Sequence, residues 1–190
     1  KRLGYRSRAA FKLAQLDDRF HFLGAGKRVV DLGAAPGGWT QVALARVAPV
    51  GKKLGRVVAA DIQPMEAVPG AVMLELDCST VEASAIIQEA LGGPADVVLS
   101  DMAPSATGHG PTDHIRILAL AEAAHETAAE LLAPGGTFIV KVWEGGASGE
   151  LLARLKQDFK TVRHVKPAAS RSDSAELYLL AQGFRRTATT

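Results

Sequence analysis

Residues 28–40 of the chain read RVVDLGAAPGGWT, and this stretch decides the fold. It begins with β-branched apolar residues, which are typical of a buried strand, and then breaks at a turn rich in Gly and Pro. From Trp39 onward the apolar residues take the spacing of a helix, at Val42, Ala43 and Val47. A strand, a glycine turn and a helix in this order open α/β domains that bind a nucleotide or a cofactor.

The turn lacks the known phosphate-binding patterns. A P-loop needs a Lys after its last glycine, and no Lys follows Gly37 or Gly38. The dinucleotide pattern Gly-x-Gly-x-x-Gly fails because Ala35 stands at the second glycine. The remaining pattern, Asp-x-Gly-x-x-Pro-Gly-Gly over residues 31–38, suits a positively charged ligand without a pyrophosphate, such as S-adenosylmethionine (SAM). A purely structural turn is the alternative. The candidate cofactor residues here are Asp31, Gly33, Pro36, Gly37, Gly38 and Trp39.

The composition is that of a soluble globular protein. The chain has 190 residues, of which 47% are hydrophobic and 22% charged, so one domain spanning residues 1–190 is expected. Its one cysteine, Cys78, forms no intrachain disulfide and indicates a reducing compartment. The five histidines lack the spacing of zinc ligands, and no apolar run is long enough to span a membrane. We therefore expect no metal, no membrane partner and a cytoplasmic location.

The rest of the chain alternates strands with helices. Further strands are expected at 56–60, 72–76, 96–100, 137–142, 161–165 and 176–181, and helices at about 7–19, 79–91, 113–132 and 149–159. Ser7, and Ser79 or Thr80, are expected helix caps, and residues 134–136 should stop the helix at 113–132. This alternation predicts a doubly wound, mainly parallel sheet, in which the last two strands pair antiparallel.

Charged residues fall at the ends of the predicted strands, where ligands bind in such folds. Asp61 is placed to accept from ribose hydroxyls and Asp77 from an adenine amino group, although a cap or a surface turn would also explain either residue. Lys141 lies inside an apolar strand, and Asp101 ends the neighbouring strand. A desolvated lysine beside an acid is a candidate general base, and a lysine that snorkels to solvent is the alternative.

Basic residues gather near both ends of the chain. The first sixteen residues contain Lys1, Arg2, Arg6, Arg8 and Lys12 and no acid. Residues 154–171 contain six basic residues and Asp158 as the one acid. The two segments could form one face for a polyanion or two separate solvated surfaces.

Five motifs in order resemble the FtsJ/RrmJ-type ribose 2′-O-methyltransferases. They are SRAAFKL at 7–13, DLGAAPGGW at 31–39, SDMAP at 100–104, VKV at 140–142 and SAELY at 174–178. The resemblance implies a Rossmann-like fold with a seven-stranded, mostly parallel sheet, SAM as the cofactor, and residues 1–22 packing on the domain as a basic helical segment. It also implies a catalytic tetrad of Lys12, Asp101, Lys141 and Glu176. The SAM contacts that it implies are Gly37, Trp39, Asp61, Asp77 and Asp101.

The resemblance implies methylation of a ribose 2′-hydroxyl, on a uridine, in large-subunit ribosomal RNA. The expected enzyme is a monomer of the bacterial cytoplasm, and an organellar origin stays open. One alternative is a tRNA ribose methyltransferase of the same family, because the tetrad handles a hydroxyl that all RNA carries. A second is a non-catalytic RNA-binding assembly factor, against which the intact tetrad argues. A third is a small-molecule O-methyltransferase, against which the basic segments argue.

Overall fold

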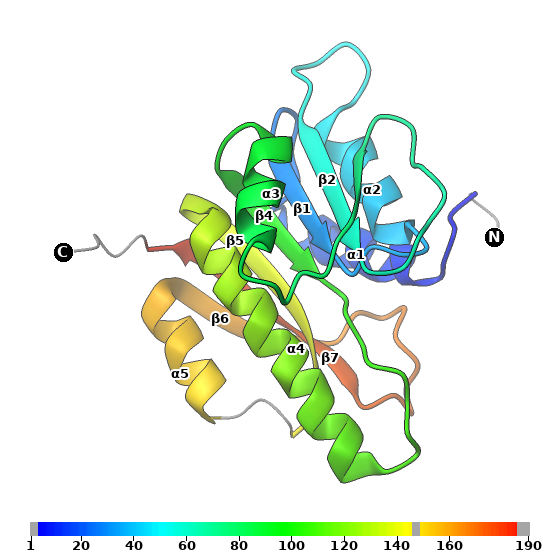
Figure 1. Ribbon diagram of the computed structural model, residues 1–190, viewed down its shortest axis with the longest axis vertical. Helices are drawn as coiled ribbons and strands as arrows, with labels where there is room; N and C mark the ends of the chain where they lie inside the picture. The colour runs from blue at the N-terminus through cyan, green and yellow to red at the C-terminus, as the bar shows by residue number, and fades with distance from the viewer. Residues whose placement is uncertain (1–3, 146–148, 186–190) are drawn as a thin grey trace.

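The computed structural model describes residues 4–145 and 149–185 as a seven-stranded sheet covered by helices on both faces (Figure 1). Lys1 and Arg2, counted above among the basic residues, lie outside the described part. The strands are β1 (Arg28–Leu32), β2 (Arg56–Asp61), β3 (Val72–Glu75), β4 (Ala95–Ser100), β5 (Leu132–Trp143), β6 (Phe159–Val165) and β7 (Glu176–Phe184). The helices are α1 (Ala9–Phe20), α2 (Gly38–Val47), α3 (Ala83–Leu91), α4 (Gly110–Leu131) and α5 (Gly149–Asp158).

The sheet has the strand order β3-β2-β1-β4-β5-β7-β6. The first five strands pair in parallel, whereas β7 is antiparallel to both β5 and β6. The predicted doubly wound sheet with an antiparallel last strand is therefore confirmed. Because β7 runs the other way, its first residue lies at the edge where the parallel strands end.

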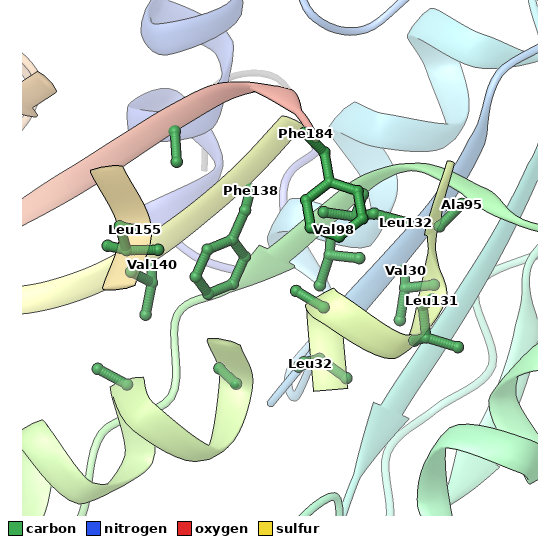
Figure 2. Close-up of a cluster of buried hydrophobic side chains, with 14 of the residues drawn as sticks. Val30, Leu32, Ala95, Val98, Leu131, Leu132, Phe138, Val140, Leu155 and Phe184 are labelled. Carbon is green, nitrogen blue, oxygen red and sulfur yellow. The ribbon is translucent and has the colours of Figure 1, made fainter. Parts of the chain in front are cut away.

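Two apolar cores form, one on each face of the sheet. Helices α3, α4 and α5 pack on one face, and Figure 2 shows part of that core around Phe138 of β5 and Val98 of β4. Helices α1 and α2 pack on the other face, where Leu13 of α1 and Trp39 of α2 are buried. Burial of about 25 cal/mol per Å² of apolar surface drives both layers together. As a result, α1 is fixed over the sheet on the side opposite α4.

Several predicted helix ends were wrong. Helix α1 begins at Ala9, its N-cap is Arg8, and no side chain caps it. Helix α3 begins at Ala83, because Ser79 and Thr80 are instead bonded to Asp77 in a turn. Pairing in β5 begins at Leu132, before the Pro-Gly-Gly stretch at 134–136, and the register shifts there.

The long predicted loop between β4 and α4 is tied down at its far end. Asp113, in the first turn of α4, accepts hydrogen bonds from the backbone N–H and the hydroxyl of Thr107. The end of the loop next to α4 is therefore anchored through Asp113. The end next to β4 begins at Asp101. No helix among the described residues has the length and apolarity to cross a membrane.

Candidate active site

The charged residues predicted at the strand ends meet at one edge of the sheet. Asp61 is the last residue of β2, Asp101 follows β4, and Lys141 lies near the end of β5. Glu176 begins the antiparallel β7 and so reaches the same edge. Lys12 comes from α1 and completes the group. The structure therefore brings together all four residues of the expected tetrad.

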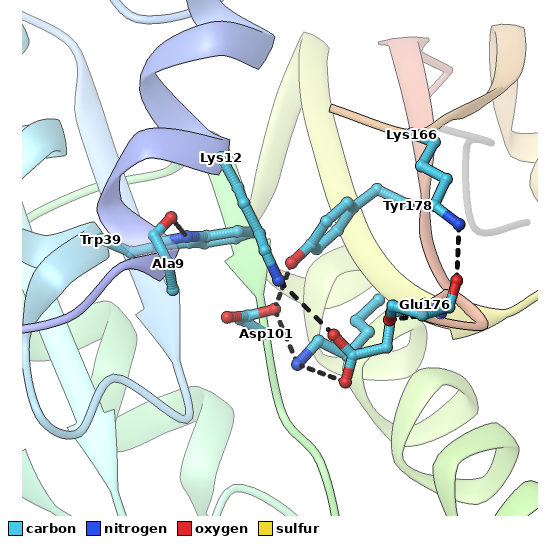
Figure 3. A network of polar contacts seen from close by, with 9 residues as sticks. Ala9, Lys12, Trp39, Asp101, Lys166, Glu176 and Tyr178 are labelled. Carbon is cyan, nitrogen blue, oxygen red and sulfur yellow. Dashed lines mark hydrogen bonds and ion pairs between the residues drawn. The ribbon is translucent and has the colours of Figure 1, made fainter. Parts of the chain in front are cut away.

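The four side chains form a chain of alternating charges, and Figure 3 labels Lys12, Asp101 and Glu176 among them. Nζ of Lys141 lies 3.1 Å from Oδ1 of Asp101 and 3.5 Å from Oε1 of Glu176. Nζ of Lys12 lies 3.5 Å from the other oxygen of Glu176. Lys141 is only 8% exposed. A buried lysine is costly unless it is paired, and here two carboxylates face its amine.

Tyr178 was not expected to contribute to the site. Its side chain is fully buried, and its hydroxyl donates a 2.7 Å hydrogen bond to Oδ1 of Asp101. Burial, and after it the charge of Asp101, raise the pKa of Tyr178 above its ordinary value, so the hydroxyl keeps its proton. The signal was available, because Tyr178 lies two residues after Glu176 in a strand and therefore points to the same face.

Trp39 and Gly38 lie behind the turn and hold α1 in place. The indole Nε1 of Trp39 donates a 2.8 Å hydrogen bond to the carbonyl of Ala9, and its ring lies 5.5 Å from that of Tyr178. A Cβ at Gly38 would overlap the hydroxyl of Ser7. Close packing at these two positions explains how Lys12, far upstream in sequence, reaches the sheet edge.

The glycine turn is bonded to the end of β2. Asp61 accepts a 2.9 Å hydrogen bond from the backbone N–H of Ala35, and Gly33 donates to the carbonyl of Ala60. Gly33 has a φ of +71°, and a Cβ there would overlap the side chain of Met102. Only glycine fits both the conformation and the contact.

Asp31 lies fully buried beneath this turn. Its Oδ2 accepts a 2.8 Å hydrogen bond from the hydroxyl of Thr40, and its Oδ1 has no partner among the described residues. Burial is the main cause that raises the pKa of Asp31 to about 7; the Thr40 bond opposes this rise, and the charges of Asp101 and Asp61 add to it.

A pocket of about 440 Å³ opens beside the turn. Gly33, Asp61, Asp77 and Asp101 line it, together with residues that include Gln63, Leu76, Cys78, Ser79, Met102 and Leu120. Asp77 is exposed and is bonded to the hydroxyl and N–H of Ser79, which hold its pKa below the ordinary value. Burial raises the pKa of Cys78 to about 11, so this thiol stays protonated. Pro36, in contrast, lines a neighbouring pocket of about 690 Å³.

A second pocket, of about 460 Å³, lies on the other side of the tetrad. Lys12 and Glu176 line it, and its other residues are Arg8, Ala9, Ala169, Arg171, Asp173 and Ser174. Asp101 belongs to the first pocket, and Lys141 bridges Asp101 to Glu176. Lys141 therefore lies between the first pocket, which is rich in acids, and the second pocket, which carries three basic residues.

Arg6 has a structural role that its basic character did not reveal. Its guanidinium donates to the carbonyls of Pro36, Glu66 and Ala67, and so joins the glycine turn to the loop after β2. Gly37 has a φ of +116°, and a Cβ there would lie 3.2 Å from the Arg6 side chain. The N-terminal segment is thus bonded to the wall of the neighbouring pocket, which Arg6, Pro36 and Glu66 line.

Comparisons with known proteins agree on one family. The model of the FtsJ-like methyltransferases matches residues 5–184. The chain is 59% identical to ribosomal RNA large subunit methyltransferase E of Parvibaculum lavamentivorans, covering 97% of this chain and 75% of that protein. It is also 59% identical to the protein of that name from Paramagnetospirillum magneticum, covering 97% and 76%. A crystal structure from Plasmodium falciparum, described as a ribosomal RNA methyltransferase, superimposes with a TM-score of 0.83 at 29% identity, covering 95% of this chain and 98% of that one.

Proposed function

Because the chain belongs to the FtsJ-like methyltransferase family, we propose that it transfers the methyl group of SAM to a ribose 2′-hydroxyl of large-subunit ribosomal RNA, on a uridine. The observation that carries this proposal is the position of Lys141, which lies between an acidic pocket and a basic one. The names of the curated relatives support ribosomal RNA rather than tRNA as the substrate.

The first pocket fits SAM in its chemistry. Asp61, Asp77 and Asp101 line it, and none of its lining residues is Lys or Arg. Such a pocket favours a ligand with positive charge and offers no side-chain cation to a phosphate. In our proposal Asp61 holds the ribose hydroxyls and Asp77 the adenine amino group, while Gly33 lets the ligand approach the backbone. When bound, SAM supplies an electrophilic methyl group on a sulfonium.

The second pocket fits the RNA. Arg8, Lys12 and Arg171 bring three cations to it beside the tetrad, against the carboxylates of Asp173 and Glu176, so its net charge is positive. Arginine and lysine side chains bind phosphates of the RNA backbone, which fixes the position of a strand without reading its bases. A ribose that enters this pocket comes next to the carboxylate of Glu176 and the amine of Lys12.

The tetrad suits removal of a proton from a weakly acidic hydroxyl. We propose that Lys141, in its amine form, accepts the proton of the 2′-hydroxyl as that oxygen takes the methyl group; the carbon–sulfur bond would break at the same time and leave a neutral thioether. The ammonium so formed lies 3.1 Å from Asp101 and 3.5 Å from Glu176, and both carboxylates stabilise it. Lys12 and Glu176 position the ribose, which is the other large contribution to such a transfer. General-base catalysis contributes on the order of 10²–10⁴-fold.

All four tetrad residues and both pockets come from one chain. We therefore propose that the enzyme acts as a monomer. The similar relatives come from bacteria, which supports a bacterial cytoplasmic enzyme that meets its RNA in the large ribosomal subunit.

One experiment tests the proposal as a whole. The protein is incubated with methyl-labelled SAM and either large ribosomal subunits or total tRNA from a host that lacks the methylation, and the labelled nucleotide is mapped. We expect one ribose methyl group in large-subunit RNA. Label in tRNA alone, or label on a base, would contradict the proposal. A Lys141→Ala control should give no label with either RNA.

A further inference from the structure

A stripe of polar and basic residues runs along α1 away from the active site. Arg8, Lys12, Gln15 and Arg19 are spaced four, three and four residues apart, so they share one face of the helix. Arg8 is the N-cap of α1, and Arg19 lies in its last turn. Lys12 belongs to the tetrad, and Arg8 lines the second pocket. The far end of the stripe lies outside both sites.

The two acids of α1 lie away from this stripe and share one cation. Asp17 and Asp18 each accept a 2.7 Å hydrogen bond from the guanidinium of Arg46 on α2. Asp17 also accepts from the backbone N–H groups of Phe22 and Leu23, which follow the helix. The negative charge of α1 therefore faces α2, and the stripe keeps its positive character.

The opposite wall of the stripe comes from β6 and the loop that follows it. The backbone N–H of Ala169 donates a 2.7 Å hydrogen bond to Oε1 of Gln15, which fastens this loop to the middle of the stripe. Farther along, the exposed Arg163 of β6 comes beside the end of α1. The two basic segments of the sequence thus meet along one face.

At the end of the stripe two arginines share one aromatic ring. The guanidinium carbon of Arg19 lies 4.9 Å from the centre of the Phe20 ring, and that of Arg163 lies 5.9 Å from it. Within residues 4–145 and 149–185, neither guanidinium pairs with a carboxylate. Both positive charges therefore lie beside one ring, and an anion bound at that ring is attracted by both of them. Planar guanidinium groups are well suited to a phosphate.

We propose that Arg19, Phe20 and Arg163 form a second contact for the RNA backbone, here called the distal arginine pair. The inference rests on the proposed function, because it extends the RNA path from the second pocket. Lys12 and Arg19 are seven residues apart, which is about 10 Å along a helix. A stacked strand rises about 3.4 Å per nucleotide, so the contacted phosphate lies about three nucleotides from the target ribose. The contact supplies affinity and no base specificity.

The test measures how RNA binding depends on length and salt. The double variant Arg19→Gln/Arg163→Gln is titrated against fluorescein-labelled uridine oligomers of two and twelve nucleotides, over a range of KCl concentrations. We expect the variant to bind the 12-mer roughly three- to tenfold more weakly, with a salt slope smaller by about 0.7 for each lost phosphate contact on a single strand. Binding of the dinucleotide, which is too short to reach from the second pocket to the distal arginine pair, should change little.

The matched control is Arg28→Gln/Arg56→Gln. These two arginines are neighbours on β1 and β2 at the opposite end of the strands, and their loss changes the net charge equally. The control should bind both oligomers like the parent, and SAM affinity should be unchanged in both double variants. Equal salt slopes for the parent and the Arg19/Arg163 variant would overturn the inference. If the parent binds RNA but does not methylate it, the proposed function is contradicted. The distal arginine pair is then tested separately, by whether the Arg19/Arg163 variant has a smaller salt slope of RNA binding than the parent.

Discussion

The hydroxyl of Tyr178 donates a hydrogen bond to Oδ1 of Asp101, and the same oxygen lies 3.1 Å from Nζ of Lys141. One carboxylate oxygen therefore has two donors from neighbouring strands, a neutral phenol and the proposed base. The phenol is buried and keeps its proton. Tyr178 thus fixes the orientation of Asp101, and through it the position of the amine of Lys141.

The Tyr178→Phe substitution should reduce turnover without preventing folding. It removes one hydrogen bond to a charged group, which is worth about 1.5–3 kcal/mol, so we expect the maximal rate to fall roughly ten- to hundredfold. The Kd for SAM should stay near the parental value. Tyr5→Phe, at a partly exposed tyrosine, is the control and should leave the rate unchanged. Parental turnover in Tyr178→Phe would show that Asp101 needs no such anchor.

Arg6 and Arg8 should affect different ligands, although only one residue, Ser7, separates them. Arg6→Gln removes the bonds that join the glycine turn to the loop after β2, so we expect a higher Kd for SAM by calorimetry. Arg8→Gln changes an exposed cation at the second pocket, so it should raise the KM for RNA and leave SAM binding alone. Equal effects of both variants on RNA, with SAM affinity unchanged, would argue against the bond network of Arg6.

Gly33→Ala should lower both stability and SAM affinity. A side chain at a positive φ costs about 1–2 kcal/mol, and at Gly33 the new Cβ would also overlap Met102. Gly51→Ala is the control that separates the cost of the positive φ from the cost of the overlap. Gly51 has a φ of +77°, and no atom lies within 4 Å of the added Cβ. The Tm of Gly33→Ala should fall clearly below that of Gly51→Ala. Equal Tm values would mean that Met102 moves aside freely.

Asp31 should make stability depend on pH in the direction opposite to that of a salt-bridged acid. Its pKa is about 7 in the folded protein and near 3.8 when unfolded. The folded state therefore holds the proton more tightly, and its stability falls as pH rises from about 4 to 7 and then levels off. The full effect is about 4 kcal/mol. We expect Asp31→Asn to lose this dependence in urea unfolding at several pH values. Parallel curves for the parent and the variant would contradict the burial argument.

The sequence predicted the elements whose signals are local. Strand β1 and the turn after it show a change of apolar period, and Asp61 and Asp101 stand directly at strand ends. The doubly wound, mainly parallel sheet also followed from the alternation of elements. Lys141 could be identified from the sequence as a candidate site residue, because a lysine in an apolar strand needs a partner for its charge.

The remaining features depend on contacts between distant segments. Arg6 looked like a surface cation because its three acceptors are backbone carbonyls, which carry no residue signature. Ser7 looked like a helix cap, yet it packs against Gly38 on another helix. The alternation along the strand places Tyr178 on the face of Glu176, but its partner Asp101 lies 77 positions away, so the sequence did not show the hydrogen bond. Only the folded arrangement reveals these roles.

In the proposed reaction Lys141 removes the proton from the 2′-hydroxyl. The most direct measurement is the single-turnover rate of Lys141→Arg with saturating SAM and RNA, beside Lys141→Ala and the parent. A guanidinium keeps the positive charge but does not give up its proton at ordinary pH. We predict that both variants bind SAM and RNA yet lose at least about a hundredfold in rate, in line with loss of a general base. A Lys141→Arg rate close to the parental one would contradict the account and leave Lys141 as a positioning cation.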